Sequence, residues 1–472
     1  MRRAKLVILL TLISPCAVQA SGGSPPPISA FFPDVTIASP ALSPDGAALA
    51  FLRHSPTRSE AIVETLASGA SRIVATTDEG APLFGAIRWR RDGRLEVYAL
   101  RRMAAPGGLA ATTLIVDGAQ SRPGGVEAAV EQRGMAGVET AAVARDVRAG
   151  VVGALGPGEP SVVSVSRDGR WRLTLDAVGA YHLYDRQTGA ARDLDELRAG
   201  PPLAELGHVE SFTFLARDGT RIPCYLTLPP QATTGPLPMV VMPHGGPMQR
   251  DGAAYDRWAQ VIATRGYLVF QPNYRGSAGY GSAWLRAGYG QWGGRIQDDI
   301  VDGVAALVRS GRADGSRVCV FGASFGGYAA LMQGALRPDL YKCVISWSGF
   351  SDLSALLRQS AARDGVASDA YRYDVRQIGD PVRDAARLRH DSPIAYAPTY
   401  GPPVLLTHGD ADETIPADQS RVMAAALADH GRDVRLNIVA GEDHGGWTAE
   451  AEETALTDVV AFIEAHIAPA AP

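Results

Sequence analysis

The residues best suited to do chemistry in this chain surround Ser324, which lies between two glycines in the segment Gly322-Ala-Ser-Phe-Gly326. The apolar run at residues 317–321 precedes this segment and is typical of a buried strand, and a stretch compatible with a helix follows it. A Gly-x-Ser-x-Gly sequence between a strand and a helix predicts a sharp turn that exposes the serine hydroxyl. The pattern therefore predicts a serine hydrolase that works through a covalent acyl intermediate.

A serine nucleophile needs a base, and the base needs an acid that holds it in the correct orientation. In folds with this turn, the acid and then the histidine follow the serine along the chain. Asp410 and Asp412 come directly after the apolar run at residues 404–407. His444 follows a second run, at residues 434–439. Because the carboxyl ends of parallel strands meet at one edge of a sheet, we expect His444 to be the base and one of the two aspartates to be the acid.

The segment His244-Gly-Gly-Pro247 follows another apolar run and adds a further chemical element. Its glycines allow backbone N–H groups to point at the negative oxygen that forms when a serine attacks a carbonyl. The N–H group of the residue after the nucleophile, Phe325, is the natural second donor. For His244 and for His408, which precedes the aspartates, we expect hydrogen bonds that shape the loops rather than a catalytic role.

The elements that would position these residues change in character near residue 200. After a hairpin over residues 211–228, apolar runs alternate with helical patterns, which is typical of a parallel sheet covered by helices on both faces. Residues 33–200 instead contain short apolar runs and an Asp-Gly turn sequence at Asp45, Asp92 and Asp168, which favours two-residue β-hairpins. The spacings of 47 and 76 residues are about one and two units of about 40, the period of a propeller blade. An irregular β-domain is the alternative.

Five motifs follow one another along the chain: His244-Gly-Gly-Pro, Asn273-Tyr-Arg-Gly-Ser277, Gly322-Ala-Ser-Phe-Gly-Gly327, His408-Gly-Asp-Ala-Asp412 and Glu442-Asp-His-Gly445. Together they resemble the prolyl oligopeptidase family of serine peptidases, and more closely its acylaminoacyl-peptidase and dipeptidyl-aminopeptidase-like bacterial branch. The resemblance covers residues 203–468 and implies an α/β-hydrolase domain preceded by a β-propeller that screens substrates. It implies that Ser324 is the nucleophile, Asp412 the acid and His444 the base. Gly246 and Phe325 would supply the oxyanion N–H groups.

Two features depart from that family's pattern. A seven-bladed propeller needs close to 300 residues at about 40 per blade, whereas about 170 precede the α/β region here, enough for about four. Acylaminoacyl peptidases often carry arginine two residues after the acid, where this chain has Thr414. No glutamate pair for a substrate's amino terminus can be located. We therefore expect a reduced propeller-like domain, and the cleavage specificity stays open.

Two other patterns suggest ligands that serine chemistry does not need. The histidines and aspartates of residues 408–412 and 443–444 could be metal ligands, but a serine nucleophile with an oxyanion loop makes a metal redundant. The sequence Gly288-Tyr-Gly-Gln-Trp-Gly293 matches a dinucleotide fingerprint, but it follows no strand and has no acidic ribose partner. We therefore expect neither a cofactor nor a metal.

Composition limits what else the chain can be. It has 472 residues, of which 46% are hydrophobic and 20% charged, which indicates a folded globular protein of several domains. The net charge of −5 is spread along the chain, which argues against a nucleic-acid partner. No apolar run approaches the roughly 20 residues that span a bilayer. Because Cys224, Cys319 and Cys343 show no ligand spacing, and Cys319 and Cys343 lie in apolar runs, we expect free buried thiols, while their pairing stays open.

The first 20 residues resemble a cleavable export signal. Arg2, Arg3 and Lys5 precede a short apolar core, and small residues precede Ser21. An uncleaved anchor, or lipid attachment at Cys16, is the alternative. We therefore expect a secreted or periplasmic protein.

The predicted organisation is a signal peptide at residues 1–20, a linker at residues 21–32, a reduced β-propeller-like domain at residues 33–200 and an α/β-hydrolase domain at residues 201–472. The predicted function is hydrolysis of peptide bonds in short peptides, by a chain that could form a homo-oligomer. A carboxylesterase or an isopeptidase-type hydrolase uses the same machinery. A non-catalytic binding module is a further class, against which the intact serine, aspartate and histidine argue.

Overall fold

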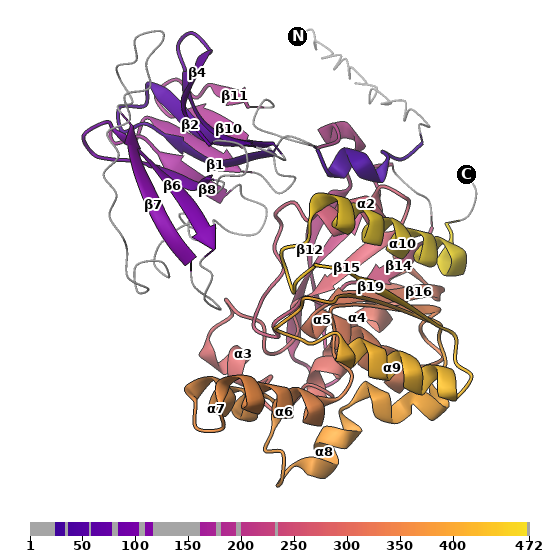
Figure 1. Cartoon of the computed structure of the whole chain (residues 1–472). Coiled ribbons are helices and arrows are strands. Elements are labelled where there is room, and N and C mark those ends of the chain that lie inside the picture. The colour runs from indigo at the N-terminus through magenta and orange to yellow at the C-terminus, as the bar shows by residue number, and fades with distance from the viewer. Residues whose placement is uncertain are drawn as a thin grey trace, which may run out of the picture.

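The computed structural model describes residues 24–33, 36–55, 58–77, 84–102, 109–116, 161–175, 181–194, 200–231 and 235–469. Figure 1 shows a β-rich N-terminal part and a larger part in which helices flank a sheet. This arrangement confirms the predicted fold class, an α/β region preceded by a β-rich region. Within the described ranges, no helix has both the length and the apolar character needed to cross a membrane. The predicted signal peptide lies outside the described residues.

Before residue 200, the described strands form three antiparallel sheets in which neighbours in the chain are neighbours in the sheet. The first sheet contains β1 (Thr36–Leu42), β2 (Ala48–Ser55), β3 (Arg58–Thr65) and β4 (Ala70–Thr76). The second contains β5 (Phe84–Trp89), β6 (Leu95–Arg102) and β7 (Leu109–Val116). The third contains β8 (Ser161–Val165), β9 (Trp171–Leu175), β10 (Tyr181–Asp185) and β11 (Ala191–Asp193). A propeller blade is also a four-stranded meander, but the described strands do not close into a ring, so the reduced propeller stays a prediction.

The three Asp-Gly sequences do connect hairpin strands, but the prediction of two-residue turns is wrong. The connection between β1 and β2 runs from residue 43 to residue 47. Gly46 has a φ of +70°, whereas Asp45 uses its side chain, whose Oδ1 accepts hydrogen bonds from the Ser43 hydroxyl at 2.6 Å and the Ala47 N–H at 3.0 Å. A longer hairpin loop of this kind needs one left-handed residue rather than two, so only the glycine takes that conformation.

The C-terminal part is built on an eight-stranded sheet with the order β12-β13-β15-β14-β16-β17-β18-β19. The pairs β12/β13 and β13/β15 are antiparallel, and the remaining pairs, from β15/β14 to β18/β19, are parallel. The strands are β12 (His208–Leu215), β13 (Arg221–Leu228), β14 (Leu237–Val241), β15 (Leu268–Pro272), β16 (Ala313–Ala323), β17 (Cys343–Trp347), β18 (Val404–Gly409) and β19 (Val434–Val439).

Helices cover both faces of this sheet, as the alternating pattern predicts. Along β16, Val318 and Val320 join the core on the side of α4, α5 and α9, whereas Cys319 and Phe321 join the core on the side of α2 and α10. The α-helices are α2 (Arg257–Ala263), α3 (Ser282–Arg286), α4 (Arg295–Arg309), α5 (Phe325–Leu336), α6 (Leu353–Asp364), α7 (Asp369–Ile378), α8 (Ala385–His390), α9 (Asp418–Asp429) and α10 (Ala449–Ile467). The 3-10 helices are η1 (Ile28–Phe31), η3 (Leu203–Glu205) and η4 (Pro393–Thr399).

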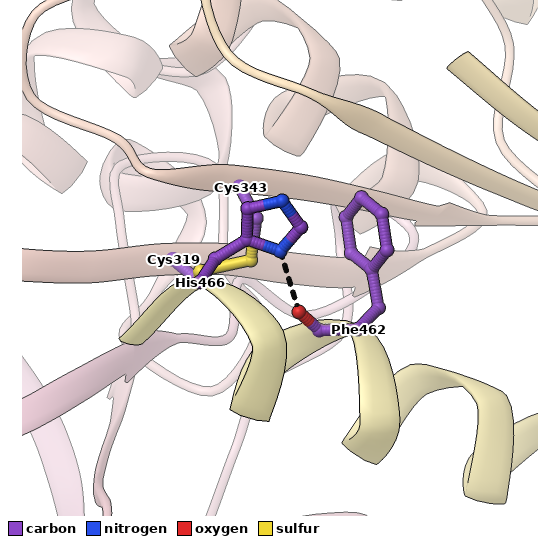
Figure 2. Close-up of a disulfide and its surroundings, with 4 residues drawn as sticks. All are labelled: Cys319, Cys343, Phe462 and His466. Carbon is purple, nitrogen blue, oxygen red and sulfur yellow. Dashed lines mark hydrogen bonds between the residues drawn. A yellow bond between two sulfur atoms is a disulfide. The ribbon is translucent and has the colours of Figure 1, made fainter. Parts of the chain in front are cut away.

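Two of the cysteines form a disulfide, so the expectation of free thiols is wrong for them. Cys319 on β16 lies directly opposite Cys343 on β17 in the parallel register, and their Cα atoms are 4.7 Å apart. Both side chains point to the face covered by α10, where Phe462 and His466 lie beside them (Figure 2). Within the described part of the chain, Cys224 is the one free cysteine, and it is buried as predicted.

Candidate active site

Ser324 occupies the sharp turn between β16 and α5, at the carboxyl edge of the sheet. Its backbone has a φ of +57° and a ψ of −122°, a conformation that residues other than glycine rarely adopt. The flanking glycines make this turn possible. A Cβ atom on Gly322 would lie 2.4 Å from the carbonyl carbon of Gly326, and one on Gly326 would lie 2.1 Å from the Pro243 oxygen. The predicted strand–turn–helix context of the serine is therefore present.

Ser324, His444 and Asp412 form one chain of hydrogen bonds. The Oγ atom of Ser324 lies 2.9 Å from Nε2 of His444. The other ring nitrogen of His444, Nδ1, lies 2.7 Å from Oδ2 of Asp412. The histidine lies in the turn after β19 and the aspartate in the turn after β18, so three neighbouring parts of one sheet edge supply the three side chains. This geometry allows the imidazole to take a proton from the serine hydroxyl while the carboxylate orients the ring.

Asp412 is held by more groups than His444 alone. Its Oδ1 accepts the N–H groups of Thr414 at 2.9 Å and Ile415 at 2.8 Å, and Nε2 of the buried His408 lies 3.2 Å from Oδ2. Burial opposes ionisation of this carboxyl, but the hydrogen bonds from His408, His444 and Ile415 outweigh it and lower the pKa of Asp412 to about 2. The acid is therefore a carboxylate throughout the ordinary pH range. The bond from His408 to the acid was not foreseen from the sequence.

The two competing aspartates both accept hydrogen bonds from backbone N–H groups. Oδ1 of Asp410 accepts the N–H of Gly441 at 2.7 Å. Oδ1 of Asp443 accepts the N–H groups of Gly445 at 3.0 Å and Gly446 at 2.7 Å, within its own loop. Of the aspartates considered from the sequence, the one that the family resemblance selects, Asp412, is the one in contact with His444. In the described ranges, no three histidine, cysteine or acidic side chains are grouped so that they could hold a metal ion.

The glycine loop after β14 passes beside the serine. A Cβ atom on Gly245 would lie 3.7 Å from the Ser324 Cβ, and Gly246 has a φ of +113°, with its Cβ position only 2.4 Å from the Met248 nitrogen. Among the described residues, no group accepts a hydrogen bond from the N–H of Gly246 or from that of Phe325. Neither N–H group is therefore used within the described structure, and their role as oxyanion donors stays a prediction.

His244 has the structural role that the sequence analysis expects. Its ring is buried and stacks on Tyr274 with a centroid distance of 4.2 Å, and the Tyr274 hydroxyl donates to the His244 carbonyl oxygen at 2.6 Å. Nε2 of His244 lies 2.7 Å from Oγ of Ser277. Burial lowers the pKa of His244 to about 4, so the ring is neutral near pH 7. These contacts fix the start of the glycine loop.

The glycine-rich segment at residues 288–293, for which no dinucleotide site was predicted, is part of the loop before α4. Its Trp292 packs edge-on against Phe325 with a centroid distance of 4.9 Å, beneath the serine turn. Phe350 and Tyr328, which stack at 4.8 Å, complete this aromatic cluster. The loop therefore supports the turn that carries Ser324.

Comparison with known proteins finds relatives among serine peptidases of one family. A family model described as the prolyl oligopeptidase family matches residues 253–470. The chain is 33% identical over 308 residues to dipeptidyl aminopeptidase BIII of Pseudoxanthomonas mexicana. The matched region covers 62% of this chain and 44% of that enzyme. The chain is 27% identical over 240 residues to the acylamino-acid-releasing enzyme of Rattus norvegicus, covering 51% of this chain and 32% of the relative. The chain thus spans less than half the length of these curated relatives.

Solved structures share the fold over most of the chain. The acylaminoacyl peptidase of Pyrococcus horikoshii superposes with a TM-score of 0.60 at 17% identity, covering 92% of this chain and 89% of that one. A puromycin-hydrolyzing peptidase of Mycobacterium tuberculosis gives a TM-score of 0.57 at 23% identity, covering 91% and 70%. At these identities the likeness establishes the fold, including the β-rich part that precedes the α/β domain.

Proposed function

The C-terminal region, residues 253–470, is a domain of the prolyl oligopeptidase family, and from that premise we propose that the chain is an exported serine peptidase acting on short peptides. The observation that carries the proposal is the continuous hydrogen-bonded path from the Ser324 hydroxyl through His444 to Asp412. Relatives with names such as dipeptidyl aminopeptidase and acylamino-acid-releasing enzyme support the peptide bond as the target.

The reaction follows from the order of Ser324, His444 and Asp412 along this path. Neutral His444 accepts the Ser324 proton at Nε2 while Oγ attacks the substrate carbonyl carbon. Asp412, ionised because its pKa is about 2, keeps the Nδ1 proton of His444 in place and stabilises the imidazolium that forms. His444 then returns the proton to the leaving nitrogen, which breaks the peptide bond and leaves an acyl-serine. Water, activated by the same histidine, releases the acid product.

The tetrahedral intermediate carries a negative oxygen that needs donors. The N–H groups of Gly246 and Phe325 serve this purpose, since Phe325 follows Ser324 directly, Gly246 follows the glycine that lies against Ser324, and neither N–H is used elsewhere in the described structure. Donors fixed in this way favour the transition state over the flat ground-state carbonyl. The peptide substrate is the only partner that this chemistry requires, and neither a metal nor a cofactor enters it.

Export belongs to the proposal because of two independent features. Residues 1–20 have the composition of a cleavable signal, and the disulfide between Cys319 and Cys343 persists in oxidising compartments. Sequencing the amino terminus of the protein recovered from the periplasm or medium tests this. A mature chain that begins at Ser21 supports cleavage, whereas a full-length chain retained in the cytoplasm contradicts it.

Labelling with a fluorophosphonate probe tests the hydrolase assignment directly. We expect wild-type protein to be labelled and Ser324→Ala not to be labelled, while the control Ser310→Ala, at the end of α4, keeps wild-type labelling. Digestion of a peptide library, read by mass spectrometry, then defines the substrate. A protein that labels at Ser324 but cleaves only esters would contradict the peptidase assignment and leave the serine hydrolase in place.

A further inference from the structure

A cavity of about 550 Å³ lies at the amino end of α2, outside the hydrogen-bonded path of the active site. The segment that follows the glycine loop forms one wall, and Glu452 on α10 contributes to another. Three carboxylates line the cavity: Asp251, Asp256 and Glu452. The question is what such a cavity can bind.

Two of these carboxylates are already satisfied. Asp256 caps α2 by accepting the Ala259 N–H at 3.0 Å, and its second oxygen accepts a hydrogen bond from the Gln271 side chain at 3.1 Å. Glu452 accepts hydrogen bonds from the Trp258 indole N–H at 2.7 Å and from Arg257 at 3.0 Å.

Asp251 is different, because its Oδ2 atom is buried and receives no hydrogen bond from the described residues. The residue is fixed through its backbone. Its N–H donates to the Asn273 side chain at 2.8 Å, and its carbonyl oxygen accepts from the same amide at 3.1 Å. The neighbouring Arg250 side chain lies against Gly279 instead. A buried carboxylate oxygen without a donor is costly, so a donor from a ligand would be favoured here.

Arg250 and Arg257 also line the cavity, but Arg257 is paired with Glu452 and Arg250 lies against Gly279, so the surroundings of Asp251 favour a positively charged donor. Burial, and after it the charge of Asp256, raises the pKa of the Asp251 carboxyl well above its usual range, and a bound cation would offset both effects by stabilising the ionised carboxylate. The rings of Tyr255 and Trp258 line the same cavity, and aromatic faces attract ammonium and guanidinium groups. Since the described residues offer no three-ligand metal group, an organic cation fits the site better than a metal ion.

Two tryptophans, Trp258 and Trp347, connect the wall of the cavity to the active site. Trp258 packs on Trp347 with a centroid distance of 4.8 Å, and the Trp347 carbonyl oxygen accepts the Ser324 N–H at 2.9 Å. Trp347 also packs at 4.4 Å on Trp447, whose indole donates to the carbonyl oxygen of the residue before His444. The cavity is therefore on the side of the histidine. In this mechanism the histidine delivers its proton to the leaving group, so the leaving fragment extends toward that side.

We propose that this cavity, with Asp251 as its anion, binds a lysine or arginine side chain in the leaving fragment of the peptide substrate. The inference deepens the proposed peptidase function and rests on it for the direction of the substrate. It makes Asp251 a specificity-determining residue on the leaving side.

Matched peptides that carry lysine or norleucine at one of the first three positions after the cleaved bond test this proposal. Affinity is measured by fluorescence anisotropy on Ser324→Ala protein, which does not hydrolyse them, and kcat/KM is measured on protein with the serine intact. We expect the lysine peptide to be favoured by about tenfold, in line with a hydrogen bond to a charged group. We expect Asp251→Asn to remove that preference without changing values for the norleucine peptide. The control Asp369→Asn removes a carboxylate that is 99% exposed and should keep the preference.

The outcomes separate the two proposals. Equal affinity of the two peptides for the Ser324→Ala protein, or a preference that survives Asp251→Asn, overturns the subsite. A lysine preference found only on the acyl side overturns the assignment to the leaving fragment. Absence of both hydrolysis and fluorophosphonate labelling contradicts the proposed function, yet the binding measurement still decides the subsite. If Asp251→Asn does not fold, butylammonium chloride should weaken lysine-peptide binding more than sodium chloride does, and an equal effect counts against the proposal.

Discussion

Removal of the Cys319–Cys343 disulfide should destabilise the α/β domain by an amount that the structure defines. The two cysteines are 24 residues apart in the sequence, so the bond closes a loop of about 25 residues. A closed loop of that length lowers the entropy of the unfolded chain by about 12 cal/mol/K, which corresponds to about 3.5 kcal/mol at 25 °C. We expect Cys319→Ala/Cys343→Ala to lose this free energy of unfolding, plus the packing of two buried sulfur atoms.

Urea unfolding followed by tryptophan fluorescence measures the loss, and Cys224 supplies a matched control. Cys224 is buried on β13 of the same sheet and forms no disulfide, so Cys224→Ala reports the cost of removing one buried sulfur alone. Wild-type protein refolded in reductant keeps all its sulfur atoms but lacks the bond. It should lose about 3.5 kcal/mol without any packing defect.

Two results would refute this reasoning. The double variant could lose no more than twice the free energy lost by Cys224→Ala, which would mean that no covalent link existed. Alternatively, alkylation of the denatured, unreduced protein could modify Cys224, Cys319 and Cys343, where the structure predicts modification of Cys224 alone.

Three further predictions concern catalysis, acid stability and substrate size. Ser324→Ala should abolish hydrolysis, His444→Ala should nearly abolish it, and Asp412→Asn should lower it less. Double variants should be little less active than the least active single variant, because the three residues act as a unit. In the same kinetic assay, an inactive Asp410→Asn beside an active Asp412→Asn would show the acid to be misassigned. The pKa of Asp412, lowered to about 2 from an ordinary 3.8, means that its ionisation stabilises the fold above about pH 4 and that this stability is lost as the pH falls toward 2. Urea titrations should therefore show wild type losing about 2 kcal/mol relative to Asp412→Asn between pH 5 and pH 2, and a difference independent of pH would contradict the shift. A monomer with a reduced N-terminal domain should cleave peptides of up to about thirty residues, whereas a dimer should exclude them because a second chain completes the wall. Cleavage rates on a nested series of peptides, measured together with the mass of the protein in solution, test this prediction. A monomer that does not cleave long peptides would contradict the argument from blade number.

Much of the α/β domain follows from its sequence because buried parallel strands are continuous apolar runs. The predicted run at residues 434–439 has the bounds of β19, and the run at residues 404–407 lies within β18. The same topology brings the ends of β16, β18 and β19 to one edge, so chain order was enough to select His444 as the base candidate. Local pattern and global fold agree at these positions, which is where prediction from sequence works best.

Other features depend on which residues face each other, and a single sequence does not reveal that. Cys319 and Cys343 each look like ordinary core thiols, and only the register of β16 against β17 makes them partners. His408 precedes a glycine as several histidines do, and its bond to Asp412 depends on the turn after β18. Asp251 follows an arginine in a loop, and nothing local indicates that its Oδ2 atom has no donor.

Two separate features hold β16, the strand that carries the nucleophile: the disulfide to β17 and the backbone hydrogen bond at the turn. Loss of the first should leave the second intact. The covalent link joins β16 to β17 at Cys319 and Cys343, four residue pairs before the register reaches Ala323 and Trp347. At the turn itself, the Ser324 N–H donates to the Trp347 carbonyl oxygen at 2.9 Å, and the glycines before and after it admit no side chain. The turn therefore depends on local backbone geometry, whereas the disulfide restricts mainly the unfolded chain. A domain weakened by about 3.5 kcal/mol should still label fully at Ser324 while it remains folded. If labelling fell in proportion to the stability lost, the disulfide would have to act on the turn itself. The inference that the turn is independent of the disulfide would then be wrong.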